Sequence, residues 1–595
     1  MANERLTGKG NGVLSSYSKR HKLIGFTFAI PALIFLLCFV LYPVTYNIYL
    51  SFTDTSLSAK KAVHFVGLKN FQTMFSNKLF KKYFWNTCKW TFWSVLGQLV
   101  LGLALALLIS RPMKGATAIR SFLLVPYVVP AVTLALVSKW ILNSDYGIVS
   151  YWCQQAGWLD ARQSFLAMKG PAMWVVVILN VWRSYPFPML IYWAALKNID
   201  NELYEAAMVD GSTKWQSFRY ITLPQLRGTT AVLVVLRIVW TATYYDLIYM
   251  VTGGGPTGST TTLPILIYQA SFGSSQLGYA AAIAMVLGVL MLICIIFYIR
   301  TGVVDDKEEG VQTMKVTSFK KQKRQSAIIT TVLLIFALLF VGFPLLWMAL
   351  SSFKPGEELF TIPPQFMPKN WSLEWYKQAF ANENVKNYFL NSLKIAGIVM
   401  IIDMIVGTLT AYSLTRFQYA GRKALMIAIL ASYCIPPIML MLPLYKIMAT
   451  VGLTGSHVGV IIGHLTITLP FSVWLLIPFY KKLPKEIDEA ALIDGASEWQ
   501  VFSRIDLPLI VSGVLSTGIM AFIMSWNEFL LSSVLVNKES MKTLTVGISN
   551  YISSTHIDWG IIMALGTITT VPVIILFAAV QKYFVEGMTA GAVKG

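Results

Sequence analysis

Two stretches of the chain carry the same charged and aromatic residues at the same spacing. Glu205 to Pro224 reads EAAMVDGSTKWQSFRYITLP and Glu489 to Pro508 reads EAALIDGASEWQVFSRIDLP, so that 11 of 20 positions are identical. Each stretch starts with good helix formers, reaches an Asp-Gly pair where a helix would end in a left-handed turn, and continues with a hydroxyl residue and Gln at capping-box spacing. The pattern predicts two short helix–turn–helix loops.

Each of these twin loops carries two aromatic residues on one face, Trp215 with Phe218 and Trp499 with Phe502. Such a face, next to carboxylates, could dock against a partner. The plainer interpretation is that both loops pack only on their own helices, with the acids solvated. Two copies at equivalent places argue against that interpretation.

Polar residues also occur inside apolar runs, where an unpaired charge is costly. Arg237, Thr241 and Tyr244 stand at i, i+4 and i+7 and share one helical face. Tyr244 and Tyr245 combine a flat apolar ring with a hydroxyl, which suits a neutral sugar. The alternative is that Arg237 pairs with Asp246 or another internal acid, and that the aromatic residues form an interfacial belt. Further candidates for a solute pathway are Asn180, Arg183, Asn527 and Glu528.

The composition indicates that membrane spans must position these residues. The chain has 595 residues, of which 56% are hydrophobic and 13% charged, whereas an ordinary soluble domain is about 45–50% apolar and 25% charged. A soluble or disordered chain does not fit these values. The net charge of +20 would raise nucleic acid as a partner of a soluble protein, but here it indicates basic loops beside lipid headgroups.

Twelve apolar runs are long enough to cross a hydrocarbon layer of about 30 Å. Six lie in the first half, near 23–45, 90–110, 120–142, 172–196, 228–250 and 279–299. Six lie in the second half, near 326–350, 392–413, 423–448, 457–480, 511–534 and 560–581. We therefore expect an all-α membrane protein of about 12 transmembrane helices.

Similarities between the halves predict two parallel six-helix repeats. Besides the twin loops, Tyr83-Phe84-x-Asn86 recurs as Tyr388-Phe389-x-Asn391. The predicted domains are a first half, 1–300, with its loop at about 197–226, a charged cytoplasmic linker, 301–325, and a second half, 326–595, with its loop at about 481–510.

A cytoplasmic N-terminus places most basic loops and the linker on the cytoplasmic side, in line with the positive-inside rule. The segment between the first two spans disagrees, because this topology puts it outside although it is basic. Its lysines are Lys60, Lys61, Lys69, Lys78, Lys81 and Lys82.

The repeated pattern E-A-A-x-x-D-G-x-x-x-W-x-x-F-x-x-I-x-L-P resembles the signature loop of binding-protein-dependent ABC importer permeases. The run from Tyr245 to Pro256, YDLIYMVTGGGP, looks like the first permease subunit of the maltose-type carbohydrate-uptake class. Trp526-Asn527-Glu528-Phe529 and the tail from Phe584 to Gly595 look like the second subunit. The resemblance covers nearly the whole chain and implies a type I ABC importer permease fold, with two normally separate subunits fused through the linker.

The resemblance also implies that each twin loop, an EAA loop in this family, docks as a coupling helix in a groove of one ATPase subunit. The coupling residues inherited by position are Glu205, Ala206, Ala207, Asp210, Gly211 and Trp215 in the first loop, and Glu489, Ala490, Ala491, Asp494, Gly495 and Trp499 in the second. The expected partners are two ABC ATPase subunits or a homodimer, an extracellular solute-binding protein, and a carbohydrate substrate that enters the cytoplasm by alternating access. The expected location is a bacterial-type cell (inner) membrane, with both termini cytoplasmic.

No motif of an enzyme or a metal site occurs in the chain. ATP hydrolysis needs G-x-x-x-x-G-K-[ST], and the nearest segment, Gly253 to Gly258 followed by Ser259 and Thr260, lacks the lysine. The histidines and cysteines show no H-E-x-x-H or C-x-x-C spacing. We therefore expect a transporter that binds no cofactor or metal of its own, with ATP and Mg²⁺ used by a partner ATPase. The rival hypotheses are a secondary transporter driven by a proton or sodium gradient, also built from parallel six-helix repeats, and a membrane enzyme or scaffold.

Overall fold

The computed structural model describes residues 21–57, 63–111, 113, 115–160, 163–300, 323–433, 435–553 and 557–592. Within these residues the regular structure is helical, apart from two isolated β-bridges. Seven helices are long and apolar enough to cross a membrane, and five further pairs of helices are bent by more than 40° at a short break. Counting each bent pair as one span gives twelve, which agrees with the predicted number.

The helices form two compact units that differ from the predicted halves. Unit 1 comprises Met1–Tyr49, Leu390–Lys542 and Ala579–Gly591, and unit 2 comprises Leu50–Phe389, Thr543–Ala578 and Ala592–Gly595. The first span is thus grouped with most of the second half, and the seventh span with most of the first half. The predicted halves describe a sequence repeat and remain a prediction, and most of the predicted linker lies outside the described residues.

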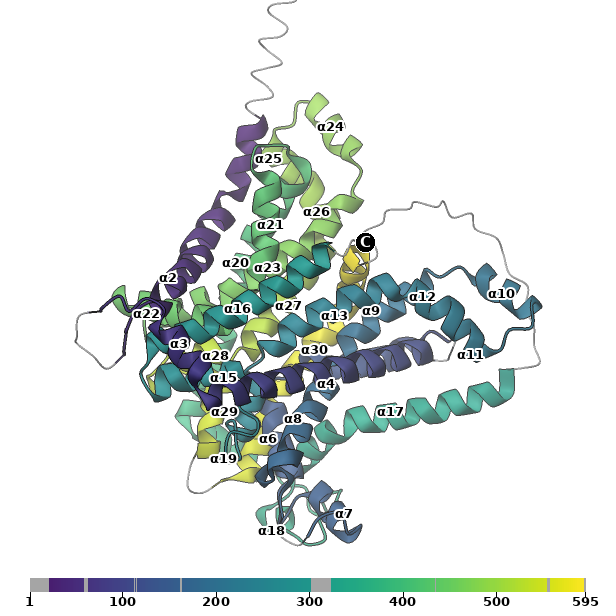
Figure 1. The fold of residues 1–595 in the computed structure, drawn as a ribbon. Helices are drawn as coiled ribbons and strands as arrows, with labels where there is room; N and C mark the ends of the chain where they lie inside the picture. Colours follow the sequence, from purple (N-terminus) through teal and green to yellow (C-terminus); the bar gives the residue numbers. More distant parts are fainter. Residues whose placement is uncertain are drawn as a thin grey trace, which may run out of the picture. The chain divides into compact units, whose positions relative to one another are not determined.

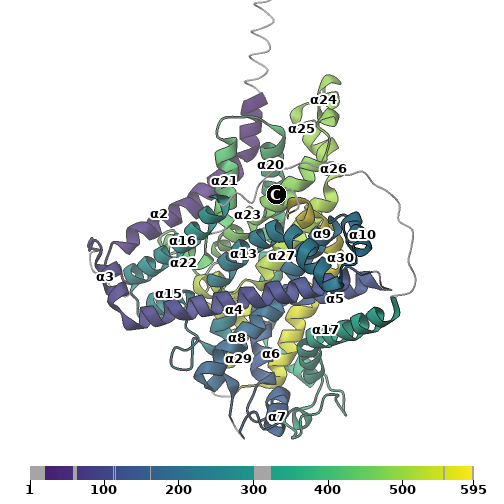
Figure 2. The same cartoon turned by 45° about the vertical axis from the view of Figure 1, so that its right-hand side comes forward.

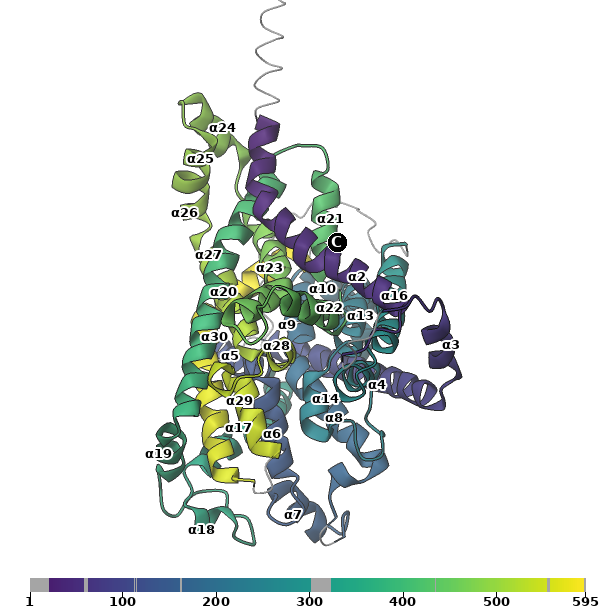
Figure 3. The ribbon, with the colours of Figure 1, turned by 90° about the vertical axis from the view of Figure 1, so that its left-hand side faces the viewer.

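Unit 1 is built around the first span, His21–Ser51, which contains the π-helical turn η1 (Leu37–Leu41) and continues as α2 (Tyr42–Ser51). Its main helices are α20 (Glu383–Arg416), α21 (Arg422–Tyr433), α22 (Pro437–Thr450), α23 (His457–Lys482), α27 (Val511–Asn527) and α28 (Leu530–Leu535). Ala29, Leu36 and Val40 of the first span share one buried apolar cluster with Tyr412 of α20 and Leu476 of α23. Figure 3 shows the first span, in purple, beside α21.

Unit 2 is organised around α4 (Lys78–Ile109), which packs against α8, α9 and α13. Its main helices are α5 (Ala116–Val128), α6 (Ala131–Ile141), α8 (Lys169–Ser184), α9 (Pro186–Lys197), α13 (Arg227–Ala242), α14 (Asp246–Thr252), α15 (Leu263–Tyr268), α16 (Leu277–Arg300) and α17 (Lys323–Ser352). Shorter helices are α3 (Lys69–Ser76), α7 (Ile148–Gln155), α18 (Gly356–Leu359), α19 (Glu374–Ala381) and α29 (Leu544–Ser553). The last helix, α30 (Trp559–Ala592), begins in unit 2, where the Trp559 ring lies 5.0 Å from the Trp140 ring.

Several predicted spans are broken, which corrects their description as single helices. The run 120–142 forms α5 and α6 at an angle of 92°, and the run 423–448 forms α21 and α22 at 97°. Pro130 and Pro436 stand at the two breaks with extended backbones, because proline has no N–H to continue a helix. The runs 228–250 and 511–534 likewise end early, at Ala242 and Asn527, before the short helices α14 and α28.

Candidate functional site

The first twin loop forms the predicted helix–turn–helix. Its elements are α10 (Asn201–Val209), α11 (Lys214–Ser217), η3 (Phe218–Thr222) and α12 (Leu223–Gln225). Gly211 adopts a positive φ of 78° at the turn, which glycine accepts without strain. A capping box between Thr213 and Gln216 then starts α11, as the sequence predicts. Figure 1 shows α10, α11 and α12 together next to α9, and Figure 2 shows α10 beside α9.

The second twin loop repeats this geometry in unit 1. Its elements are α24 (Lys485–Ile493), α25 (Glu498–Gln500), η5 (Val501–Asp506) and α26 (Leu507–Leu509). Gly495 has a φ of 87°, and Ser497 forms a capping box with Gln500. Figure 3 shows α24 beyond α25 and α26, at the end of the unit. Both loops therefore confirm the predicted local structure.

Most of the candidate coupling residues lie at the surface. Those exposed are Glu205, Ala206, Asp210, Gly211 and Trp215 in the first loop, and Glu489, Ala490, Asp494, Gly495 and Trp499 in the second, while Ala207 and Ala491 are half-buried. The apolar tip of each first helix is a feature that the sequence did not indicate, with Val209 88% exposed and Ile493 86% exposed. An apolar side chain this exposed at the same place in both loops suits a surface that a partner covers.

A buried arginine braces the second loop, and the sequence analysis did not anticipate it. Arg416 ends α20 with its Nε 2.9 Å from Asp488 Oδ2 and 3.3 Å from Asp506 Oδ2. Its Nη1 donates a hydrogen bond of 3.1 Å to the Leu483 carbonyl. Burial and the Asp506 carboxylate raise the pKa of Asp488 from 3.8 to about 7, although Arg416 acts in the opposite direction.

The first loop has a hydrogen bond between uncharged side chains at the corresponding place. Tyr204 and Thr222 stand 284 positions before Asp488 and Asp506. Their hydroxyl groups lie 2.9 Å apart and link α10 to the end of η3. The twin loops are therefore alike in backbone but differ in the chemistry that fixes them.

The first span also contacts the second loop directly. His21 Nδ1 lies 2.6 Å from Glu498 Oε1, at the start of α25. The Phe28 ring stacks on the Trp499 ring, with centroids 6.1 Å apart and planes inclined by 8°. One face of the Trp499 ring is thus covered by the first span.

A polar cluster inside unit 2 contains four of the predicted solute-pathway residues. Arg237 is 5% exposed, and its Nε donates a hydrogen bond of 2.6 Å to Gln98 Oε1 of α4. Arg183 of α8 lies over the Tyr244 ring, 5.5 Å from its centroid. The Thr241 Oγ1 and the Tyr244 hydroxyl are buried without a hydrogen-bond partner among the described residues. Arg237 and Thr241 lie on α13, but this helix ends at Ala242, so Tyr244 lies beyond it and the prediction of one shared helical face is wrong for Tyr244. The buried side chains of Arg237 and Thr241 and the buried hydroxyl of Tyr244 still provide hydrogen-bond donors and acceptors.

The remaining predicted pathway residues lie elsewhere or in other roles. Tyr245 does not join the Tyr244 ring but packs with Tyr249 and Tyr268, whose centroids are 4.8 and 5.1 Å away. Asn180 is 2% exposed, accepts a hydrogen bond from Ser184 Oγ, and leaves its Nδ2 without a partner in the described part of the chain. Asn527 belongs to unit 1, where it ends α27.

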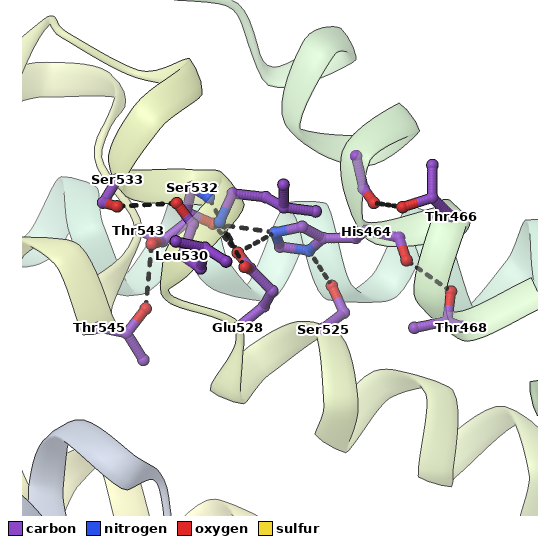
Figure 4. Close-up of polar contacts among 12 residues, drawn as sticks. His464, Thr466, Thr468, Ser525, Glu528, Leu530, Ser532, Ser533, Thr543 and Thr545 are labelled. Carbon is purple, nitrogen blue, oxygen red and sulfur yellow. Dashed lines mark hydrogen bonds and ion pairs between the residues drawn. The ribbon is translucent and has the colours of Figure 1, made fainter. Parts of the chain in front are cut away.

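A buried network around His464 is a further feature that the sequence analysis missed (Figure 4). His464 of α23 has its Nδ1 2.7 Å from Ser525 Oγ and its Nε2 3.0 Å from Glu528 Oε2. The Glu528 carboxylate accepts backbone hydrogen bonds from Leu531 and Ser532 and so caps α28. The network joins three helices of unit 1. A histidine within an apolar run was the available signal.

No group of three or more metal-ligating side chains occurs among the residues that the structure describes. The buried His464 and Glu528 instead bind one another and nearby serines. These polar groups are thus used for hydrogen bonds within the chain.

The comparisons with known proteins all point to one family of transport proteins. The sequence model of the binding-protein-dependent transport system inner membrane component matches residues 98–307 and again 403–590. The probable ABC transporter permease protein YurM of Bacillus subtilis is 31% identical over 268 residues, which are 44% of this chain and 87% of that protein. The trehalose/maltose transport system permease protein MalG of Thermococcus litoralis is 33% identical, over 42% of this chain and 91% of that protein.

Two further relatives extend the comparison. The sulfoquinovosyl glycerol transport system permease protein SmoG of Agrobacterium fabrum is 33% identical, over 47% of this chain and 90% of that protein. A solved chain of a bacterial ABC transporter involved in the import of the acidic polysaccharide alginate is 25% identical, with a TM-score of 0.43. The match covers 49% of this chain and 99% of the solved chain.

These relatives are permease proteins of transport systems, as predicted for a transporter rather than an enzyme. Each corresponds to less than half of this chain, and the family model matches twice. The long apolar helices make the chain an integral membrane protein. The chain belongs to the family of binding-protein-dependent transport system inner membrane components, with two permease sequences fused in one polypeptide.

Proposed function

We propose that this chain is the complete transmembrane permease of an ATP-driven importer, which moves a sugar, an oligosaccharide or a sugar derivative into the cytoplasm. Relatives named for trehalose/maltose, diacetylchitobiose and sulfoquinovosyl glycerol transport support a carbohydrate substrate. A solute-binding protein would deliver the solute outside the cell, and the permease would open alternately to either side.

The observation that carries this proposal is the duplicated loop with an exposed apolar tip. Val209 and Ile493 are nearly fully exposed at equivalent places, beside exposed carboxylates. We infer that each tip inserts into a groove of one ATPase subunit, while Glu205 and Glu489 pair with basic residues at its rim. ATP and Mg²⁺ would be bound by those subunits, whose closure would drive the transport cycle.

Copurification tests the docking of the ATPase. The tagged chain is isolated from its native membranes in mild detergent, beside a Val209→Asp, Ile493→Asp variant. We expect an ABC ATPase to copurify with the unaltered chain and to be lost from the variant, because a carboxylate in an apolar groove is costly. The control variant Ile362→Asp, Leu373→Asp alters equally apolar residues, 65% and 56% exposed, outside the loops and should retain the ATPase.

An ATPase that stays bound to the loop variant contradicts the docking surface. If no ATPase copurifies with the unaltered, folded chain, and uptake collapses with the ion gradient but survives loss of ATP, the rival secondary transporter is correct.

The solute would contact the polar cluster of unit 2. Thr241 and Tyr244 offer buried hydroxyl groups that have no hydrogen-bond partner among the described residues, and the aromatic ring of Tyr244 offers an apolar face. In proteoliposomes with all partners, Tyr244→Ala and Thr241→Ala should raise the KM for uptake or lower its rate. The control is Tyr279→Ala, because Tyr279 lies outside the cluster and its hydroxyl accepts a hydrogen bond from Asn77. Unchanged kinetics in both cluster variants would show that the solute passes elsewhere.

A further inference from the structure

The lysines between the first two spans are not explained by transport, and their charge opposes the predicted topology. Lys60 and Lys61 lie outside the described residues, and Lys82 is held by a hydrogen bond of 2.8 Å to the Thr257 carbonyl. Lys78, Lys81 and Lys89 of α4 are exposed, and none of the three forms an ion pair within the described part of the chain. These three ammonium groups are therefore available to a ligand.

The three lysines lie on one helical face, which we call the α4 outer face. Positions 78, 81, 85, 89, 92, 96 and 100 are separated by steps of three and four residues, the spacing of a single face. This face comprises Lys78, Lys81, Trp85, Lys89, Phe92, Leu96 and Val100, all of them exposed. Along this face three lysines, with Trp85 among them, are followed by the apolar side chains of Phe92, Leu96 and Val100.

The length of α4 places this change at a membrane surface. The helix has 32 residues, about 48 Å, whereas the hydrocarbon layer takes about 20 residues. Counting 20 residues back from Ile109 reaches Trp90, which places Lys89 at the edge of the hydrocarbon layer. Lys81 and Lys78 lie about 14 and 18 Å beyond this edge along the helix, so their long side chains would have to extend back toward the headgroups. Trp93, whose ring lies 5.2 Å from that of Trp174 on α8, marks the boundary, since tryptophan is enriched there.

We propose that Lys78, Lys81 and Lys89 bind the phosphate groups of anionic phospholipids in the leaflet at this end of α4. Each ammonium carries three hydrogen-bond donors and a charge opposite to that of the headgroup. The same face continues as Phe92, Leu96 and Val100, whose apolar side chains suit acyl chains. An acidic soluble protein could pair with the lysines but would leave Phe92, Leu96 and Val100 uncovered, which favours lipid as the occupant.

The other half of the chain has a less basic version of this surface. At the positions 305 residues later, α20 carries Glu383 in place of Lys78, although Lys386 and Lys394 correspond to Lys81 and Lys89. The glutamate opposes an anionic headgroup. We therefore expect anionic lipid to bind preferentially at α4. Bound lipid phosphates would neutralise the lysines, so the basic segment would be compatible with a position outside the cell.

Native mass spectrometry of the purified full chain in neutral detergent tests this site, with dioleoylphosphatidylglycerol as the probe and dioleoylphosphatidylcholine as the neutral comparison. The variant Lys78→Gln, Lys81→Gln, Lys89→Gln should bind phosphatidylglycerol about tenfold more weakly and phosphatidylcholine unchanged. The variant with arginine at the same three positions should retain the affinity, because it keeps the charge. The matched control, Lys377→Gln, Lys386→Gln, Lys394→Gln, alters three exposed lysines of α19 and α20 and should stay within about twofold of the unaltered chain.

Three outcomes would overturn the proposal. Phosphatidylglycerol affinity that is unchanged in the glutamine variant would leave the lysines to a protein partner. An equal loss in the control variant would indicate a general effect of net charge. A loss in the arginine variant as large as in the glutamine variant would indicate that the substitutions disturb the helix itself.

Discussion

At the scale of single residues, Arg416 compensates two buried carboxylates and so determines how the second loop is held. Arg416→Met keeps most of the side-chain volume but leaves Asp488 and Asp506 facing one another. We expect this to destabilise the loop by about 3–5 kcal/mol, the usual effect of removing one partner of a buried ion pair. Faster amide hydrogen exchange over residues 483–510 of the full chain would show it. Arg504→Met, at an exposed position of the same loop, should change the exchange little, and equal effects would contradict the bracing role.

The raised pKa of Asp488 predicts how this loop responds to pH. Its pKa is about 7 in the folded loop and 3.8 ordinarily, so between these values the folded loop binds more protons than the unfolded one. Stability of the loop should therefore rise as pH falls from about 7.5 towards 5. Amide exchange of α24, corrected for intrinsic rates, should slow over this range, and Asp488→Asn should remove the dependence. The opposite slope, or an unchanged slope in the variant, would show that another group titrates.

These residues also show what the sequence could predict. The capping boxes at Thr213 and Ser497 depend on contacts within three residues, and both were predicted correctly. The Arg416 tie joins residues 72 and 90 positions apart, which no local pattern reveals. A signal was present, because the second half has acids where the first half has Tyr204 and Thr222.

At the scale of elements, apolar runs predict where spans exist but not whether a proline breaks them. Pro130 and Pro436 separate two helices each, whereas Pro344 lies inside α17 and Pro470 inside α23 without ending them. The difference depends on which neighbouring groups satisfy the carbonyl groups that proline leaves free. That is tertiary information, so the twelve spans were predictable whereas their bends were not.

The short helix α28 depends on Glu528, which caps it and binds His464 of α23. Glu528→Ala removes the acceptor of two backbone N–H groups and leaves the histidine without its acid. We expect a loss of about 3 kcal/mol or more, measured as a lower melting temperature of the purified chain and faster exchange in α28. Glu539→Ala breaks the Glu539–Lys542 pair, in which Glu539 is 47% exposed, and should cost no more than about 1 kcal/mol. Equal decreases of the melting temperature in the two variants would show that the His464 network contributes little to stability.

At the scale of the whole molecule, each compact unit combines segments from both predicted halves. In unit 1, the first span shares its buried cluster with α20 and α23, and Ser413 Oγ donates a hydrogen bond of 2.6 Å to the Gly25 carbonyl. In unit 2, α17 packs on α5 and α6, and Trp182 Nε1 donates to the Phe340 carbonyl. Periodicity and repeats identify the halves but carry no information on which half a terminal span packs against. The exchange of spans is therefore visible only in three dimensions.

This exchange predicts that the covalent connection between the halves is not needed to hold them together. The test uses a protease site placed within 301–325 and cut in the purified full chain, to give fragments of about half its length. We expect the fragments to coelute in mild detergent, because each unit is completed by the first span of the other half and separating the fragments would expose both buried interfaces. Phe28→Ala with Val40→Ala would remove apolar contacts from one of them and should favour separation after cutting, whereas Leu23→Ala, at a 66% exposed position, should not. Fragments that separate without any substitution would show that the exchanged spans contribute little to assembly.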